Sequence, residues 1–159
     1  MAFESAGPVV FGGGKSMVTA TLGANDPEVG TRKTFGDEEY VFVYNTGADA
    51  QINPGHGAVL SAVTGYSVTV SSTSSSDILL GVCKHATITT AAYGWLMTRG
   101  FTSVEMGASY SATAGDLLEL AGDGTFDVKS NTTANANFVG KAMEAIASGA
   151  SGQAYISCT

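Results

Sequence analysis

The second half of this 159-residue chain contains one pattern of small residues twice. The first copy, GVCKHATITTAAYGWLMTR, begins at Gly81, and the second, GKAMEAIASGASGQAYISC, begins at Gly140. In each copy a second glycine, Gly94 or Gly152, stands directly before an apolar-rich segment, and the spacing between the two glycines is one residue shorter in the second copy. Glycines at fixed offsets let backbones approach closely and turn tightly. The repeat therefore predicts a duplicated unit of β-structure, and neither copy supplies a nucleophile together with a base and an orienting group.

Short β-prone segments separated by turn-forming residues follow one another from residue 39 onward. The sequence Ala-Gly-Asp-Gly at 121–124 predicts a hairpin between Leu117–Leu120 and Thr125–Lys129, because Asp-Gly supports a left-handed turn conformation. Further strands are expected at Glu39–Tyr44, Gly65–Val70, Asp77–Lys84, Trp95–Arg99, Ser103–Met106 and Tyr155–Cys158, with Phe138–Ile146 as a strand that runs into a turn. Strands at this spacing are typical of an all-β sandwich or barrel.

The length suits one domain, since domains typically hold roughly 100–150 residues. We expect residues 31–159 to form a single, compact, mainly β domain, either a β-barrel or β-tulip-like fold or a sandwich, with short strands and Gly-rich turns. Residues 1–30 show no sustained hydrophobic period and predict an extended, flexible N-terminal arm. Its apolar residues would dock on a partner: Phe3, Val9, Val10 and Phe11.

Charge and composition argue against nucleic-acid and membrane partners. Only 13% of the residues are charged, against roughly 25% in ordinary globular proteins, and the net charge is −7. Because the few Lys and Arg residues are scattered, we expect no nucleic-acid partner. No apolar run approaches the ~20 residues that span a bilayer, and the N-terminus does not resemble a signal peptide. Neither a membrane partner nor export is therefore expected.

Two motifs that could carry chemistry are better explained as structural. Gly14-Lys15-Ser16 matches the end of a phosphate-binding loop, but Val9 stands where the first glycine of that motif belongs, so a hinge is expected. His56 and His85 are too far apart for the usual metal-ligand spacing, and we expect both to be solvated.

The two cysteines, Cys83 and Cys158, occupy related places in the two copies of the repeat. With no export signal and no CxxC spacing, they predict reduced, buried thiols rather than a disulfide or a zinc site. Tyr93, Trp95 and Met97 alternate along one segment and are expected in the core or at a subunit interface. We expect no catalytic residue, metal or cofactor.

From Gly30 onward the chain contains an ordered series of motifs. They are Gly30-Thr31, DEEYVFVY at Asp37–Tyr44, the turns Asn45-Thr46-Gly47-Ala48 and Asn53-Pro54-Gly55, and three longer segments. These segments are LLGVCKHATITTAAYGWLMTRG (Leu79–Gly100), AGDLLEL (Ala114–Leu120) and FVGKAMEAIASGASGQAYIS (Phe138–Ser157). In this order the motifs resemble the small capsid decoration, or cement, proteins of tailed bacteriophages, whose pattern favours Ala at the position of Cys83.

This resemblance implies a mainly β protein that forms a homotrimer and binds the major capsid protein on the outer surface of a virion assembled in the host cytoplasm. A ligand that binds only the mature lattice stabilises it by its binding free energy. The N-terminal arm would become ordered on that surface.

Two other classes remain open. A fibre-type virion module that binds glycans would use exposed aromatic rings at Trp95, Tyr93 or Tyr110. A glycan hydrolase would need two carboxylates among Asp116, Glu119 and Asp123.

Overall fold

The computed structural model describes residues 18–19, 21–22, 26–47, 51–61, 65–70, 79–129 and 138–158. The described elements are strands and one 3₁₀ turn: β1 (Val18–Thr19), β2 (Arg32–Phe35), β3 (Glu38–Asn45), β4 (Gly57–Leu60), β5 (Ser67–Thr69), β6 (Leu79–Val82), β7 (Tyr93–Glu105), β8 (Leu117–Leu120), η1 (Gly122–Gly124), β9 (Phe126–Val128), β10 (Phe138–Ala142) and β11 (Ser151–Ser157).

The first half of the fold is a closed five-stranded β-barrel, which we call barrel 1. Its strands pair in the ring β3–β5–β4–β6–β7, and β7 then pairs with β3 to close the ring. The β3–β5 pair is parallel and the other four pairs are antiparallel. On the outside of this ring, β2 pairs with β3 and β1 pairs with β7.

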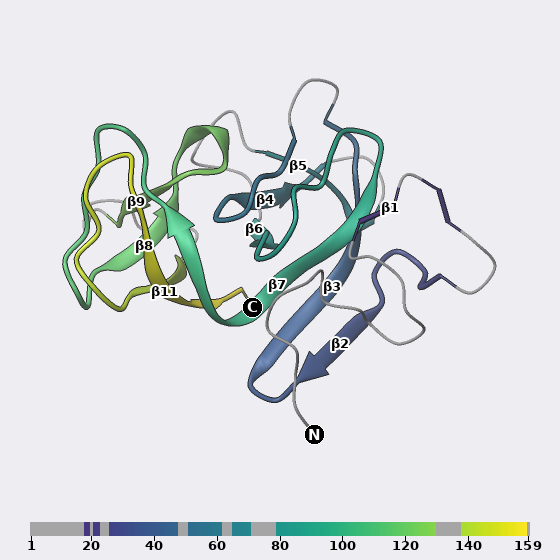
Figure 1. Cartoon of the computed structure of the whole chain (residues 1–159), viewed down its shortest axis with the longest axis horizontal. Coiled ribbons are helices and arrows are strands. Elements are labelled where there is room, and N and C mark those ends of the chain that lie inside the picture. Colours follow the sequence, from purple (N-terminus) through teal and green to yellow (C-terminus); the bar gives the residue numbers. More distant parts are fainter. Residues whose placement is uncertain are drawn as a thin grey trace.

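The second half repeats this arrangement and shares one strand with the first. The C-terminal part of β7 pairs with β11, and the sheet continues through β10 and β8 to β9. A parallel bridge between Met106 and Phe126 then joins the end of β7 to β9, which closes a second ring that we call barrel 2. The long, curved strand β7 crosses the molecule and forms a wall of both barrels (Figure 1).

The two barrels share several irregular features as well as strand order, although the register shift between Glu39 and Tyr40 in the β3–β7 pair has no counterpart in the β7–β11 pair. The β4–β6 pair of barrel 1 and the β8–β10 pair of barrel 2 each contain a register shift. Each barrel has one antiparallel bridge outside its strands, Ile52–Ile88 or Ala112–Ile146. The parallel β3–β5 pair has its counterpart in the parallel Met106–Phe126 bridge. The duplicated unit predicted from the glycine pattern is thus present.

The repeated glycines mark places where a side chain does not fit. A Cβ atom added at Gly81 would lie 2.7 Å from the carbonyl oxygen of Met97, and one added at Gly140 would overlap the carbonyl oxygen of Tyr155. At Gly94 and Gly152 the added atom would meet an isoleucine side chain, Ile88 or Ile146 respectively, at 2.6 Å. The glycines therefore allow neighbouring strands and bridges to approach, and the same approach occurs in both barrels.

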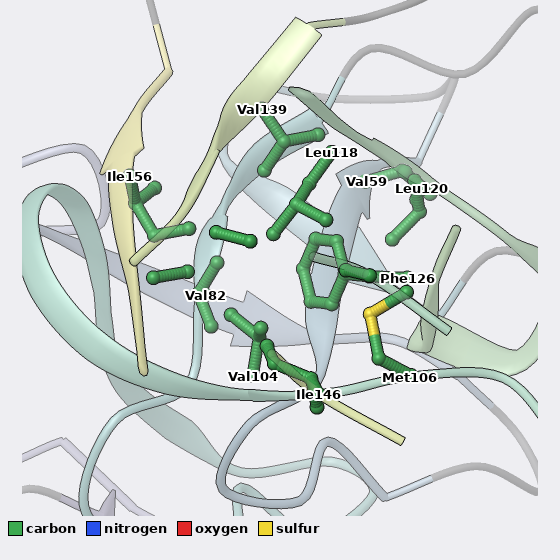
Figure 2. Close-up of a cluster of buried hydrophobic side chains, with 13 residues drawn as sticks. Val59, Val82, Val104, Met106, Leu118, Leu120, Phe126, Val139, Ile146 and Ile156 are labelled. Atoms are coloured by element: carbon green, nitrogen blue, oxygen red, sulfur yellow. The ribbon is translucent and has the colours of Figure 1, made fainter. Parts of the chain in front are cut away.

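The two cores are not independent. The core of barrel 1 consists of Val41, Val43, Ile52, Ala58, Val68, Leu80, Cys83, Ile88, Ala92 and Leu96. The core of barrel 2 includes Val104, Met106, Leu118, Phe126 and Ile146, and it also includes Val59 and Val82 from the strands of barrel 1 (Figure 2). The outer surface of β4 and β6 thus completes the interior of the second barrel.

The mainly β fold and its barrel form are confirmed. The hairpin after Leu120 has the expected left-handed residues, Asp123 at φ 58° and Gly124 at φ 79°. The prediction of separate strands at Trp95–Arg99 and Ser103–Met106 is wrong, because β7 continues through Gly100 at φ 129°. Gly100 lies inside the strand and does not end it. The predicted division at residue 30 stays a prediction; within 1–30, Val18–Thr19 forms the strand β1.

We predict that Gly140→Ala lowers the free energy of unfolding by about 1–3 kcal/mol, because the new methyl group overlaps the backbone of β11. Gly122 is a matched control, since a Cβ atom added there would meet nothing within 4 Å. Gly122→Ala should change stability by less than about 0.5 kcal/mol. Denaturant unfolding of both variants measures the difference, and equal stability of the two would contradict the proposed close approach.

We also predict that the two barrels unfold together. Val82→Ala removes buried methyl groups from the shared core and should destabilise the chain by about 2 kcal/mol. Hydrogen exchange followed by mass spectrometry should then show faster exchange in both β3 and β11. Faster exchange confined to one barrel would show that the cores are uncoupled.

Candidate interaction surface

The three aromatic and methionine residues singled out in the sequence lie on the outer face of β7. Trp95 and Met97 form a third buried cluster with Tyr40 and Phe42 of β3, and Tyr93 packs against it. The register explains this arrangement, because Phe42 lies opposite Trp95 and Tyr40 lies opposite Met97. Alternation along both strands sends these side chains to the face that points away from the core of barrel 1.

This aromatic cluster is covered within the single chain. Trp95 is 4% exposed and Met97 is fully buried. The rings of Phe42 and Trp95 lie 5.0 Å apart at a tilted angle, and the ammonium group of Lys33 on β2 lies 5.8 Å from the centre of the Trp95 ring. A cation over an aromatic face adds to the packing. Because its ring is covered, Trp95 does not present a stacking face to a sugar in this structure.

A polar network lies at the edge of the cluster. The hydroxyl of Tyr40 donates to Glu38 Oε2 at 2.5 Å, and Lys84 forms an ion pair with Glu38 Oε1. His85 stacks on the Tyr40 ring, with its Nε2 atom 3.3 Å from the Tyr40 hydroxyl. Burial and the bond to Glu38 raise the pKa of Tyr40. Burial alone would raise the pKa of Glu38, but hydrogen bonds from Lys84 and Tyr40 lower it overall.

The histidines are not the solvated groups that we predicted. His85 is half-buried against Tyr40, and burial followed by the charge of Lys84 lowers its pKa below 6.5. The side chain of His56 is 13% exposed, and its Nε2 atom lies 3.0 Å from Glu105 Oε2. This contact joins a turn of barrel 1 to the end of β7. The two histidines belong to different surroundings.

The two cysteines do not occupy equivalent places in the two barrels, so the prediction that the repeat relates them is wrong. In barrel 1 the backbone N–H of Gly55 donates to the carbonyl oxygen of Cys83. In barrel 2 the backbone N–H of Gly115 donates to the carbonyl oxygen of Ala142. Ala142 is therefore the counterpart of Cys83, whereas Cys158 follows β11. Both thiols are free, and burial raises the pKa of each to about 12.

The other predicted site residues do not form a constellation for catalysis. Asp116 accepts bonds from the backbone and hydroxyl of Thr113 at 2.8 Å, and these bonds lower its pKa. Glu119 lies on β8 opposite Asp127 of β9, and Asp123 lies in η1. The Phe3, Val9, Val10 and Phe11 positions lie outside the described residues. Tyr110 is 42% exposed.

Barrel 2 presents a surface that the sequence did not reveal. Phe101 of β7 is 52% exposed, and its ring lies 5.0 Å from that of Tyr155 on β11. The Nε atom of Arg99 donates to the Tyr155 hydroxyl at 3.1 Å, and the Arg99 guanidinium also contacts Glu39. The pair Phe101–Tyr155 holds the register position that Tyr40–Met97 holds in barrel 1. That equivalence is the signal that could have located the surface, but it requires the strand register.

The described residues contain no group of three or more His, Cys, Asp and Glu side chains that could hold a metal ion. Within the same ranges, no helix is long and apolar enough to cross a membrane.

We predict that His85 makes folding less favourable as the solution is acidified. The pKa of His85 is lowered in the folded state from its ordinary value of 6.5. As pH falls, His85 therefore binds a proton in the unfolded chain before it does so in the folded chain. Stability contributed by neutral His85 is therefore present above about pH 6.5 and is lost as pH falls below it. Between about pH 7.5 and 5.5, the free energy of unfolding should fall less in His85→Gln than in the wild type. Equal losses in denaturant titrations would contradict this assignment.

Comparison with protein-family models and with curated proteins gives no match. Among solved structures, the chain is similar to the N base of the head fiber protein gp8.5 of bacteriophage phi29. The TM-score is 0.53, with 15% sequence identity over 76% of this chain and 94% of that chain. At this level of identity the comparison shows that the two proteins share a fold.

Proposed function

We propose that this chain is a structural protein of a bacteriophage virion. The observation that carries the proposal is the fold shared with a phage head fiber base, which extends over 94% of that base. The order of sequence motifs, which resembles that of capsid decoration proteins, points independently to the same class of particle. A low fraction of charged residues, 13%, suits a surface that becomes covered on assembly.

Within that class, we propose that the chain binds the outer surface of the capsid as a decoration or cement protein. Its partners are the major capsid protein and further copies of itself, as a homotrimer. A protein that binds the mature lattice and not its dissociated subunits stabilises the lattice by the free energy of binding. Repetition of the contact over a symmetric shell multiplies a modest affinity. The role that we propose is non-catalytic and uses no cofactor.

One other virion role is favoured by a specific observation. Because the structural neighbour is the base of a head fiber, the chain could instead anchor a projecting fibre, including one that binds glycans. The two roles differ in what they do to the shell. A cement protein raises the temperature at which the shell comes apart, whereas a fibre base leaves that temperature unchanged.

The test uses purified virions of the phage that encodes the chain and shells that lack it. Mass spectrometry should find the chain in virions, and electron cryomicroscopy should place it on the outer surface. Shells without it should come apart at a lower temperature, and added purified protein should restore the wild-type value. A chain that is absent from virions overturns the virion role. A chain that is present but leaves shell stability unchanged supports the fibre-base role.

The predicted arm supplies a sharper version of this experiment. Phe3→Ser combined with Phe11→Ser should weaken rebinding to shells if the arm docks there, because apolar area is lost from the contact. Thr89→Ala, an exposed position in barrel 1, is the control and should rebind as the wild type does. Equal rebinding by the two variants would remove the arm from the contact.

A further inference from the structure

The internal repeat shows what covers one outer surface of barrel 1. The outward positions of β4 and β6 are small or apolar, and Val59 and Val82 belong to the core of barrel 2. A Cβ atom added at Gly57 would meet Leu120 at 2.7 Å and Phe126 at 3.2 Å, both from barrel 2. A barrel of this fold therefore packs directly on the outer surface of a β4–β6 pair.

The same surface exists in barrel 2, where no part of the described chain buries it. Gly57 lies opposite Val82 in barrel 1, and Leu117 lies opposite Lys141 at the same place in barrel 2. Leu117 is therefore the counterpart of Gly57, and Lys141 is the counterpart of Val82. Glu119 likewise replaces Val59. Leu117 is 41% exposed and Lys141 is exposed as well.

This surface continues across the neighbouring strands without interruption. Phe101 lies opposite Tyr155, Tyr155 lies opposite Lys141, and Lys141 lies opposite Leu117. One row of side chains thus crosses β7, β11, β10 and β8. We call the surface the barrel 2 outer face, and it consists of Arg99, Phe101, Leu117, Glu119, Lys141 and Tyr155.

The corresponding row of barrel 1 is buried. Tyr40 is 2% exposed and Met97 is fully buried. Their counterparts in barrel 2 are accessible: Phe101 is 52% exposed and Tyr155 is partly exposed. Burial along β7 changes accordingly: its N-terminal half is buried on both faces, and its C-terminal half alternates between buried and accessible residues. An apolar row on an accessible sheet face is typical of a protein–protein contact.

We propose that the barrel 2 outer face binds a second copy of this chain. A second copy is the occupant because the equivalent β4–β6 surface is already covered by a barrel of this same fold. Charge supports the same choice. Copies with a net charge of −7 repel one another, but this face carries Arg99 and Lys141 together with Glu119, so a positive group of one copy can lie beside the carboxylate of another. The inference deepens the self-association included in the proposed function and rests on it.

The polar replacements also explain why the face is left accessible. Glu119 and Lys141 stand where barrel 1 has two valines, so the isolated chain keeps charged groups in contact with water there. Leu117 and Phe101 supply the apolar area that a contact between copies would bury. The face therefore has the mixed composition of a separable interface rather than that of a folded core.

Sedimentation equilibrium of the full chain, over a range of concentrations, tests the proposal. The wild type should associate, and Leu117→Glu and Phe101→Glu should each weaken self-association at least about tenfold. Leu22→Glu is the matched control, because Leu22 is also 41% exposed but lies outside the face, and it should associate as the wild type does. Circular dichroism and thermal melting verify that each variant is folded.

A second measurement tests the charges without altering apolar area. Lys141→Glu should weaken association, and the effect should persist when salt is lowered, because the variant face carries like charges. A wild type that stays monomeric up to about 1 mM overturns the proposal, as does association that none of the face variants weakens. Shell binding is scored separately: if the face variants dissociate but the wild type binds no shell, the interface stands and the decoration role fails.

Discussion

The structure depends on one strand being shared by two barrels. β7 pairs with β3 through its N-terminal half and with β11 through its C-terminal half, and Arg99 lies opposite residues of both partners. Gly100 follows at once, at φ 129°, where a Cβ atom would lie 3.1 Å from Glu38. A glycine at this point lets the chain leave one ring and enter the other within a single strand, Tyr93–Glu105. Because the shared strand fixes both rings, Val59 and Val82 of barrel 1 can complete the interior of barrel 2.

The sequence could predict features whose cause is local. Gly81 and Gly140 were found because a backbone that approaches this closely excludes any side chain, so the same residue recurs in both units. The hairpin at Asp123-Gly124 was found for a similar reason, since its φ angles restrict the residue type. Ring closure could not be predicted in this way. The parallel β3–β5 pair and the Met106–Phe126 bridge join segments distant in sequence, and no short pattern specifies which strands meet.

The two barrels differ mainly where their side chains point outward. Inward positions change little: Val43 of β3 corresponds to Val104 and Ile88 corresponds to Ile146, and where Val41 is replaced by Thr102 the new side chain is similar in size and also buried. On the outer face, by contrast, the register places Gln153 where barrel 1 has Trp95. Interior packing tolerates little change in volume, whereas an outer position is limited only by what covers it. Comparison of the two barrels therefore separates residues that maintain the barrel from residues that give each barrel its own surface. For Phe101 and Tyr155, the sequence alone did not supply this distinction.

Burial and pairing determine the protonation state of the buried polar groups. Burial raises the pKa of Cys83 and Cys158 to about 12 and also raises that of Tyr40, so these groups stay protonated near neutral pH and are poor nucleophiles or bases. The ionised groups beside them are paired: Lys84 neutralises Glu38 while Glu38 holds the Tyr40 hydroxyl. Such a network fixes the position of β3 relative to the segment after β6. The outer sheet surface of barrel 2 stays accessible, and Phe101, Leu117 and Lys141 are exposed there. The thiols and the Tyr40 hydroxyl are thus held protonated in the interior, and the apolar side chains turned outward are the groups left for the contact between copies that we propose.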